Sequence, residues 1–267
     1  MNIAPSRPHM RTVTATRYVT PLREGGSLPA IMEADDDGLY VVKFRGAGQG
    51  PKSLIAEVVS GEIGRAIGLR VPELVVIDVD EALSKAEPDQ EIQELLRKSA
   101  GLNIGVDFLP GSLAYNPRPA DTVDSAFAAA VIWFDALTMN VDRTPRNPNM
   151  LIWHGLPWLI DHGASIYVHH LTDEFATRAG GAFPQIADHV LMPWASSVAA
   201  AGDALAPLVT AELLTDILAL VPDDLITDGA GDERGRTREE YLTFFVDRIA
   251  QRSQFEQEAE RVRTRAV

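Results

Sequence analysis

The sequence contains no cysteine, so disulfides, thiolate zinc sites and cysteine nucleophiles are all excluded. It also lacks an apolar run of the ~18 residues that a membrane-spanning helix needs. No signal peptide is recognisable at its start. We therefore expect a cytoplasmic protein without a membrane partner.

Basic residues are scarce relative to acidic ones. Lys and Arg number 24 against 38 Asp and Glu, and the formal net charge is -14. Nucleic-acid backbones are bound chiefly by clustered Lys and Arg, so we expect no nucleic-acid partner. A magnesium nucleotide remains compatible with this acidity, because the metal ion brings its own positive charge to carboxylates. Otherwise the acidic excess favours solubility.

What the sequence does contain is typical of a folded protein. Hydrophobic residues make up 46% and charged residues 23% of the 267 positions. That length is enough for one large domain or for two lobes, with a core of ordinary size. No internal repeat or low-complexity tract is present, so the chain is interpreted as a succession of different elements.

The first part of the chain is predicted to be rich in β-strands. Thr, Val and Tyr in residues 11–22 indicate a strand, and residues 29–44 have the pattern of a hairpin that turns at Asp36-Asp37-Gly38. Apolar residues recur at every fourth position within 52–69, which predicts an amphipathic helix. Three further elements are expected, namely a strand at 71–80, a polar helix at 89–99 and a strand at 102–108.

The segment GAGQGPKS (46–53) shares a glycine-rich start and a Lys-Ser pair with the phosphate-binding loop of P-loop NTPases. That loop requires a glycine at position 51, where this chain has Pro51. Proline has no N–H to donate and fixes φ, so a P-loop is excluded. We interpret the segment as a flexible joint between the strand that carries Lys43 and the helix that follows.

The second part of the chain is predicted to be mostly helical. A Pro- and Gly-rich loop after residue 108 precedes a strongly apolar helix at 121–140, and most of the chain beyond residue 170 also has helical patterns. We therefore predict an α+β fold with two parts, a small β-rich part at 13–108 and a larger helical part at 109–267.

A hairpin near the middle of the chain brings polar residues together. The apolar runs NMLIW and LPWLI flank His154-Gly155, a two-residue turn of the kind that makes a β-hairpin. Extending the ladder from this turn places Asn147 beside Asp161, with Asp142 one loop away. Neighbours in such a ladder have Cβ atoms roughly 5 to 8 Å apart.

Two oxygen ligands at that range are suited to a hard cation such as magnesium, and a third carboxylate beside them could accept a proton from an attacking hydroxyl. This arrangement is typical of phosphoryl transfer. The alternative is structural, because Asp, Asn and Pro commonly form turns after helices. From the spacing alone, both interpretations stay open.

The sequence resembles known kinases at this point. NVDRTPRNPNMLI (140–152) followed by LIDHG (159–163) is similar to the pattern N-x-D-R-x-x-x-N-x-N and I-D-x-G of HipA-like kinases and phosphatidylinositol kinases. In protein kinases generally, the corresponding motifs are H-R-D-x-x-x-x-N and D-F-G. YVVKF (40–44) resembles the kinase strand that bears a phosphate-contacting lysine, and residues 52–73 resemble the segment that follows it in HipA-type domains.

The resemblance implies a two-lobed protein kinase-like fold, with a small β-rich N-lobe and a larger α-helical C-lobe. It also implies an ATP-dependent phosphotransferase similar to HipA-like serine/threonine kinases, which transfers the γ-phosphate to a hydroxyl acceptor. Lys43, positioned by Glu57, would contact the α and β phosphates of ATP. Asn147 and Asp161 would hold Mg²⁺, and Asp142 would take the proton of the acceptor hydroxyl.

The chain departs from typical protein kinases in two motifs: the residue two before Asp142 is Asn140 and not His, and the glycine motif before the lysine strand is missing. Instead of G-x-G-x-x-G it has only REGGSLP before the lysine strand, where Gly25, Gly26 and Ser27 are the candidates to cover the nucleotide phosphates through backbone N–H groups. An ordinary glycine turn is the alternative. Two other functions also stay open: a catalytically silent, nucleotide-binding scaffold (a pseudokinase), and a small-molecule or lipid kinase. The expected partner is a protein or small molecule that carries the acceptor hydroxyl.

Overall fold

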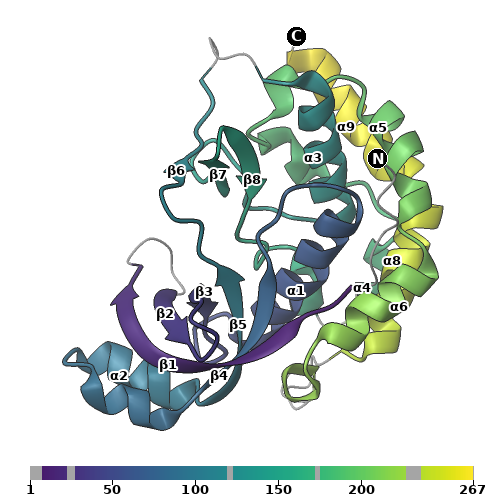
Figure 1. The fold of residues 1–267 in the computed structure, drawn as a ribbon. Helices are drawn as coiled ribbons and strands as arrows, with labels where there is room; N and C mark the ends of the chain where they lie inside the picture. The colour runs from purple at the N-terminus through teal and green to yellow at the C-terminus, as the bar shows by residue number, and fades with distance from the viewer. Residues whose placement is uncertain (1–7, 23–27, 119–122, 172–174, 227–235, 267) are drawn as a thin grey trace.

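The computed structural model describes residues 8–22, 28–118, 123–171, 175–226 and 236–266. It consists of a β-barrel at one end and a helical body at the other, as Figure 1 shows. The strands are β1 (Arg11–Pro21), β2 (Ala30–Ala34), β3 (Leu39–Lys43), β4 (Leu74–Val79), β5 (Gly101–Asp107), β6 (Leu113–Ala114), β7 (Met150–Trp153) and β8 (Leu156–Leu159). The α-helices are α1 (Gly50–Ala66), α2 (Gln90–Lys98), α3 (Ser125–Thr138), α4 (Phe175–Arg178), α5 (Val198–Leu205), α6 (Ala211–Leu220), α8 (Arg238–Ala250) and α9 (Ser253–Ala266). No helix in these ranges is long and apolar enough to cross a membrane.

The N-terminal strands close into a barrel in the order β1-β2-β3-β5-β4. The predicted hairpin is present as β2 and β3, in which Ala30 pairs with Val42 and Glu33 pairs with Leu39. Closure depends on β1, which pairs antiparallel to β2 on one side and parallel to β4 on the other. The barrel has its own apolar core, into which α2 contributes side chains (Met32, Tyr40, Val42, Phe44, Val75, Ile77, Ile92, Leu96).

Helix α1 is buried on nearly every side, which corrects the prediction of an amphipathic helix. All residues from Leu54 to Gly64 are buried. The reason is its position between the barrel and the helical body (Figure 1), where its apolar side chains join the core of the C-terminal helices. Glycine makes this close approach possible, since a Cβ on Gly61 would lie 2.8 Å from the Leu74 side chain.

The second hairpin forms with the predicted register. Trp153 pairs with Leu156 and Met150 pairs with Leu159. His154 (φ 49) and Gly155 (φ 75) form the turn, and two successive positive φ angles are what a type I′ hairpin turn requires. The short strand β6, within the stretch predicted as a loop, adds to β7 as a third strand.

The helical body has a core that is separate from that of the barrel. Aromatic residues of α3, α8 and α9 are buried in it, including Trp133, Phe244 and Phe255. A charged residue is buried there too. Arg248 of α8 donates to the carbonyls of Leu137 at 2.8 Å and Ala179 at 3.0 Å, and also to those of Ala136 and Gly181. Its guanidinium lies 4.7 Å from the centre of the Phe255 ring.

The β-rich part and the helical part confirm the predicted two-lobed α+β fold. The exact division of the chain at residues 108 and 109 stays a prediction.

Candidate active site

Lys43, at the end of β3, lies between two carboxylates from other elements. Its Nζ donates to Oε2 of Glu57 on α1 at 2.8 Å and also to Oδ1 of Asp161, which follows β8. The lysine side chain is only 13% exposed and that of Glu57 only 1%. Burial alone would lower the pKa of Lys43, but the two carboxylates outweigh it and raise that pKa, so the ammonium is held charged.

Glu57 joins β3, α1 and the segment after β8. Its Oε2 accepts from the backbone N–H of His162 at 2.8 Å in addition to Lys43. Burial would raise the pKa of Glu57, yet the charge of Lys43 and the side chain of His162 together lower it to about 2. The His162 ring is fully buried and packs edge-on against Phe134 at a centroid distance of 5.7 Å. This side chain is therefore part of the interior.

Asp142 lies in the loop between α3 and β7, held by two amides. Its Oδ2 accepts from Nδ2 of Asn147 at 2.8 Å and from Nδ2 of Asn149 at 3.1 Å. Burial raises the pKa of Asp142, and the negative charge of Asp161 raises it further against these hydrogen bonds. A higher pKa makes a carboxylate a better proton acceptor.

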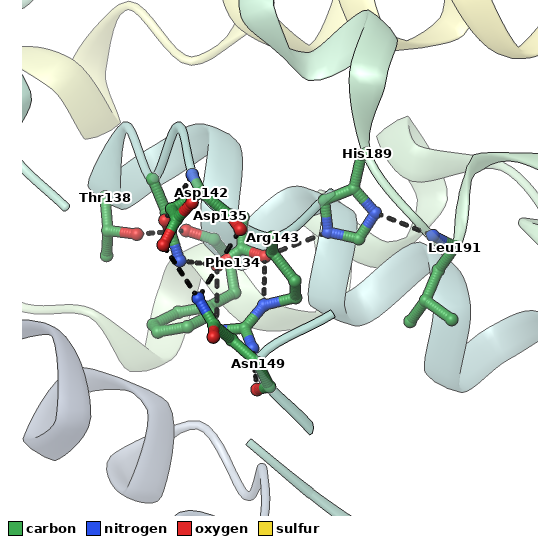
Figure 2. A network of polar contacts seen from close by, with 9 residues as sticks. Phe134, Asp135, Thr138, Asp142, Arg143, Asn149, His189 and Leu191 are labelled. Carbon is green, nitrogen blue, oxygen red and sulfur yellow. Dashed lines mark hydrogen bonds and ion pairs between the residues drawn. The ribbon is translucent and has the colours of Figure 1, made fainter. Parts of the chain in front are cut away.

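A buried ionic network lies beneath this loop (Figure 2). Asp135 of α3 accepts from Nε of Arg143 at 2.6 Å and faces Nε2 of His189 at 2.9 Å. All three side chains are at most 2% exposed. Arg143 also donates to the carbonyl of Asn149. Burial would raise the pKa of Asp135, but Arg143 and His189 outweigh it and lower the pKa to about 2.

The structure brings the predicted site residues into two connected groups. Lys43 is in direct contact with both Glu57 and Asp161, and Asp142 is in contact with Asn147. The charge of Asp161 acts on Asp142, which connects the groups electrostatically. Their catalytic roles stay predictions.

Gly25, Gly26 and Ser27 fall outside the described residues. The joint after β3 is described, and it ends where α1 begins, at Gly50 with Pro51 in the first turn. Proline is favoured there because its missing N–H has no partner inside the helix.

A comparison with known protein families identifies the family of this chain. Residues 16–179 match the family described as HipA-like kinase. The chain belongs to the HipA-like kinase family. That membership makes the chain a kinase-type phosphotransferase, and it confirms the resemblance inferred from the catalytic loop. The match includes every residue named above as a site candidate, and it ends before His189.

One solved kinase structure is similar to this chain in fold. The chain is similar to the Helicobacter pylori proinflammatory kinase CtkA, with 13% identity, a TM-score of 0.56, and coverage of 97% of this chain and 98% of that one. It is also similar to the Golgi casein kinase with Mn/ADP bound, with 10% identity, a TM-score of 0.48, and coverage of 95% and 74%. Likeness at such identities concerns the fold. No curated protein matches the sequence significantly.

The donor set of this HipA-like kinase fits a magnesium ion. Among the described residues, no three His, Cys, Asp or Glu side chains form a metal-binding group by themselves. Magnesium needs less than that, because it is often held by one or two protein oxygens together with substrate phosphates and water. Nδ2 of Asn147 is used on Asp142, which leaves its amide oxygen as a ligand. The side chain of Asp161 is 48% exposed and has a second carboxylate oxygen besides the one that contacts Lys43.

Two residues of the buried network were not predicted from the sequence. Asp135 is an acid within a strongly apolar helix, which is a signal that could have identified it as a buried partner. His189 lies among apolar neighbours. It is in the core, but its imidazole is hydrogen-bonded to Asp135. Arg143, which directly follows Asp142, is buried against that same carboxylate.

Buried histidines predict how stability depends on pH. Burial lowers the pKa of His189, and it lowers that of His169 well below its usual range. In the unfolded chain these histidines are protonated near pH 6.5, whereas in the folded chain they are protonated only at lower pH. Between the lowered pKa values and about pH 6.5 the unfolded state binds more protons, so the free energy of unfolding decreases as the pH falls through this window.

Urea unfolding between about pH 5 and 8 measures this dependence at one fixed temperature. The midpoint is expected to fall on acidification below about pH 6.5, and His169→Gln is expected to flatten the decline because it removes one of the titrating groups. A midpoint that stays constant or increases on acidification would contradict the prediction.

Proposed function

We propose that this HipA-like kinase transfers the γ-phosphate of ATP to a hydroxyl group, and that the acceptor is a serine or threonine side chain of a protein. The observation that carries the proposal is the contact of Lys43 with both Glu57 and Asp161. A fixed cation beside a carboxylate that can ligate a metal provides what nucleotide phosphates need. Asp142 lies within electrostatic reach of that cluster.

In this proposal each described residue has one task. Lys43, held charged by Glu57, contacts the α and β phosphates. Mg²⁺, when held by Asn147 and Asp161, would neutralise charge on the β and γ phosphate oxygens. Asp142 accepts a hydrogen bond from the acceptor hydroxyl and orients it towards the γ-phosphorus.

The bond changes follow from these positions. The acceptor oxygen forms a bond to the γ-phosphorus as the bond between that phosphorus and the β–γ bridging oxygen breaks, and ADP leaves with the electron pair. The hydroxyl proton passes to Asp142. Its raised pKa helps it to receive this proton, while its two amide partners hold the carboxylate in place. The protein contributes alignment and charge neutralisation, and it forms no covalent bond.

Radiolabelled ATP with the purified protein, and with a protein lysate as acceptor, tests the proposal. Label is expected on serine or threonine of a protein, and acid hydrolysis of the product identifies the residue. Label on a lipid or on a small molecule would replace the protein acceptor. ATP binding without any transfer would support the scaffold alternative instead.

Lys43→Met is expected to lower kcat/KM for ATP about 100-fold, because a phosphate contact and the pairing of two carboxylates are lost together. Lys98→Met is the matched control. Lys98 is exposed on α2, where it pairs with Glu94 four residues earlier. Steady-state kinetics with varied ATP measures both variants. Equal activity of the two variants would remove Lys43 from the proposed site.

A further inference from the structure

The imidazole of His189 is hydrogen-bonded through both of its nitrogens. Nδ1 lies 3.0 Å from the backbone nitrogen of Leu191, and Nε2 lies 2.9 Å from Oδ2 of Asp135. The side chain is only 2% exposed. Figure 2 shows the ring reaching towards Asp135 from a segment separate from α3 and the catalytic loop.

These contacts identify the tautomer of His189. The Leu191 N–H can only donate, so Nδ1 must accept and carries no proton. The proton of the neutral ring is therefore on Nε2, which donates it to Asp135. Burial lowers the pKa of His189, which agrees with a neutral ring. The network beneath the loop consequently has one anion, Asp135, one cation, Arg143, and one neutral donor.

Asp135 holds the backbone of Asp142, the predicted proton acceptor, in place by two routes. On one side, Nδ2 of Asn140 donates to Oδ1 of Asp135 at 3.1 Å, and Oδ1 of Asn140 accepts from the backbone N–H of Asp142 at 3.0 Å. On the other side, Arg143 directly follows Asp142 and donates to both Asp135 and the carbonyl of Asn149. The backbone of Asp142 is thus fixed on both sides by one buried carboxylate.

The segment of His189 also contacts the loop through its backbone. The N–H of Val190 donates to the carbonyl of Arg143 at 3.0 Å. His189 therefore contacts the carboxylate that anchors the catalytic loop, and Val190 contacts the loop itself. They lie beyond residue 179, where the match to the family ends.

The geometry points to His189 as a positioning residue for phosphoryl transfer. Its Nε2–H fixes the carboxylate of Asp135, and that carboxylate sets the position of Asp142 through Asn140 and Arg143. This inference rests on the proposed function for its effect on the rate, because His189 itself touches no reacting group. Its structural content, the support of residues 140–149 by the 189–191 segment, does not depend on activity.

Two substitutions test whether the hydrogen bond to Asp135 matters or whether any polar side chain at position 189 is sufficient. The amide nitrogen of Gln can take the place of Nε2, so His189→Gln keeps a donor to Asp135. His189→Asn keeps an acceptor at the place of Nδ1 for the Leu191 N–H but is too short to reach Asp135. We expect His189→Asn to lower kcat about tenfold with KM for ATP unchanged, because a small displacement of a reacting group costs rate rather than binding. His189→Gln is expected to keep kcat within about threefold of wild type.

A stability control and a second measurement complete the experiment. Ser197→Ala removes the side-chain cap of α5 and so lowers Tm without touching the loop, and it is expected to keep the wild-type kcat. Hydrogen exchange of the peptide 140–149 is expected to accelerate in His189→Asn and to stay close to wild type in His189→Gln.

The outcomes distinguish this inference from the proposed function. If the wild-type protein transfers no phosphate, the proposed function fails, and the exchange rates alone decide whether His189 supports the loop. Equal exchange and equal kcat in the Asn and Gln variants would overturn the positioning role. So would a loss of kcat that simply follows Tm across all three variants.

Discussion

Asp142→Asn is expected to lower kcat about 1000-fold, within the range that a positioned general base contributes to a rate. The amide has nearly the same shape as the carboxylate, but it cannot take the proton of the acceptor hydroxyl. The hydrogen bond from the acceptor hydroxyl is lost as well. Two amides donate to Oδ2 of Asp142, so they would hold the oxygen of the new asparagine at that position. Its nitrogen, which cannot accept a hydrogen bond, would then replace Oδ1. Single-turnover transfer from radiolabelled ATP measures the rate of the chemical step directly.

ATP binding is the internal control for this prediction. Asp142 is not among the residues that contact Lys43, so the affinity for ATP is expected to change less than about threefold. Asp247→Asn is the matched variant, because Asp247 is exposed on α8. A transfer rate in Asp142→Asn within about tenfold of wild type would reject the proton-acceptor role, because a positioned base contributes more than that.

Arg248→Met is expected to destabilise the fold by about 3 to 5 kcal/mol, because buried carbonyls that lose their donor cost about 1 to 3 kcal/mol each, while the loss of a desolvated cation offsets part of this cost. Methionine can fill much of the volume but donates no hydrogen bond. Four carbonyls, from Ala136, Leu137, Ala179 and Gly181, lose a donor in the interior at once. The contact over the Phe255 ring is lost as well.

Urea unfolding monitored by tryptophan fluorescence measures this loss, because Trp133 lies in the same core. Arg261→Met on α9 is the matched control, since Arg261 is exposed and pairs with the nearby Glu258. It is expected to change stability by less than about 1 kcal/mol. If Arg248→Met were as stable as this control, the buried guanidinium would contribute nothing to the packing of α3 against the segment at 179–181.

Local patterns in the sequence were sufficient to predict most strands and the pairing register of one hairpin. The turn His154-Gly155 specifies how β7 and β8 pair, because a two-residue turn leaves only one alignment. The closure of the barrel was not predictable in this way. The parallel pairing of Arg11 with Val75 joins residues that are far apart in the chain, and no local signal determines it.

The sequence predicted the residues of the candidate site and their order, but not the buried residues that hold the catalytic loop in place. Lys43, Glu57, Asp142, Asn147 and Asp161 belong to motifs with recognisable spacing. His189 belongs to none, since it reaches Asp135 across 54 positions and lies among apolar residues. The helical periodicity of α1 likewise indicated one buried face, whereas the contacts of both lobes bury all of them.

The burial of α1 has a consequence for how the two lobes are joined. The helix follows the barrel strands in sequence, but its apolar side chains pack in the core of the C-terminal helices. Lys43 belongs to a barrel strand and Glu57 to this helix, so their ion pair crosses the boundary between the two cores. The candidate site therefore contributes a polar contact of its own to the junction between the lobes.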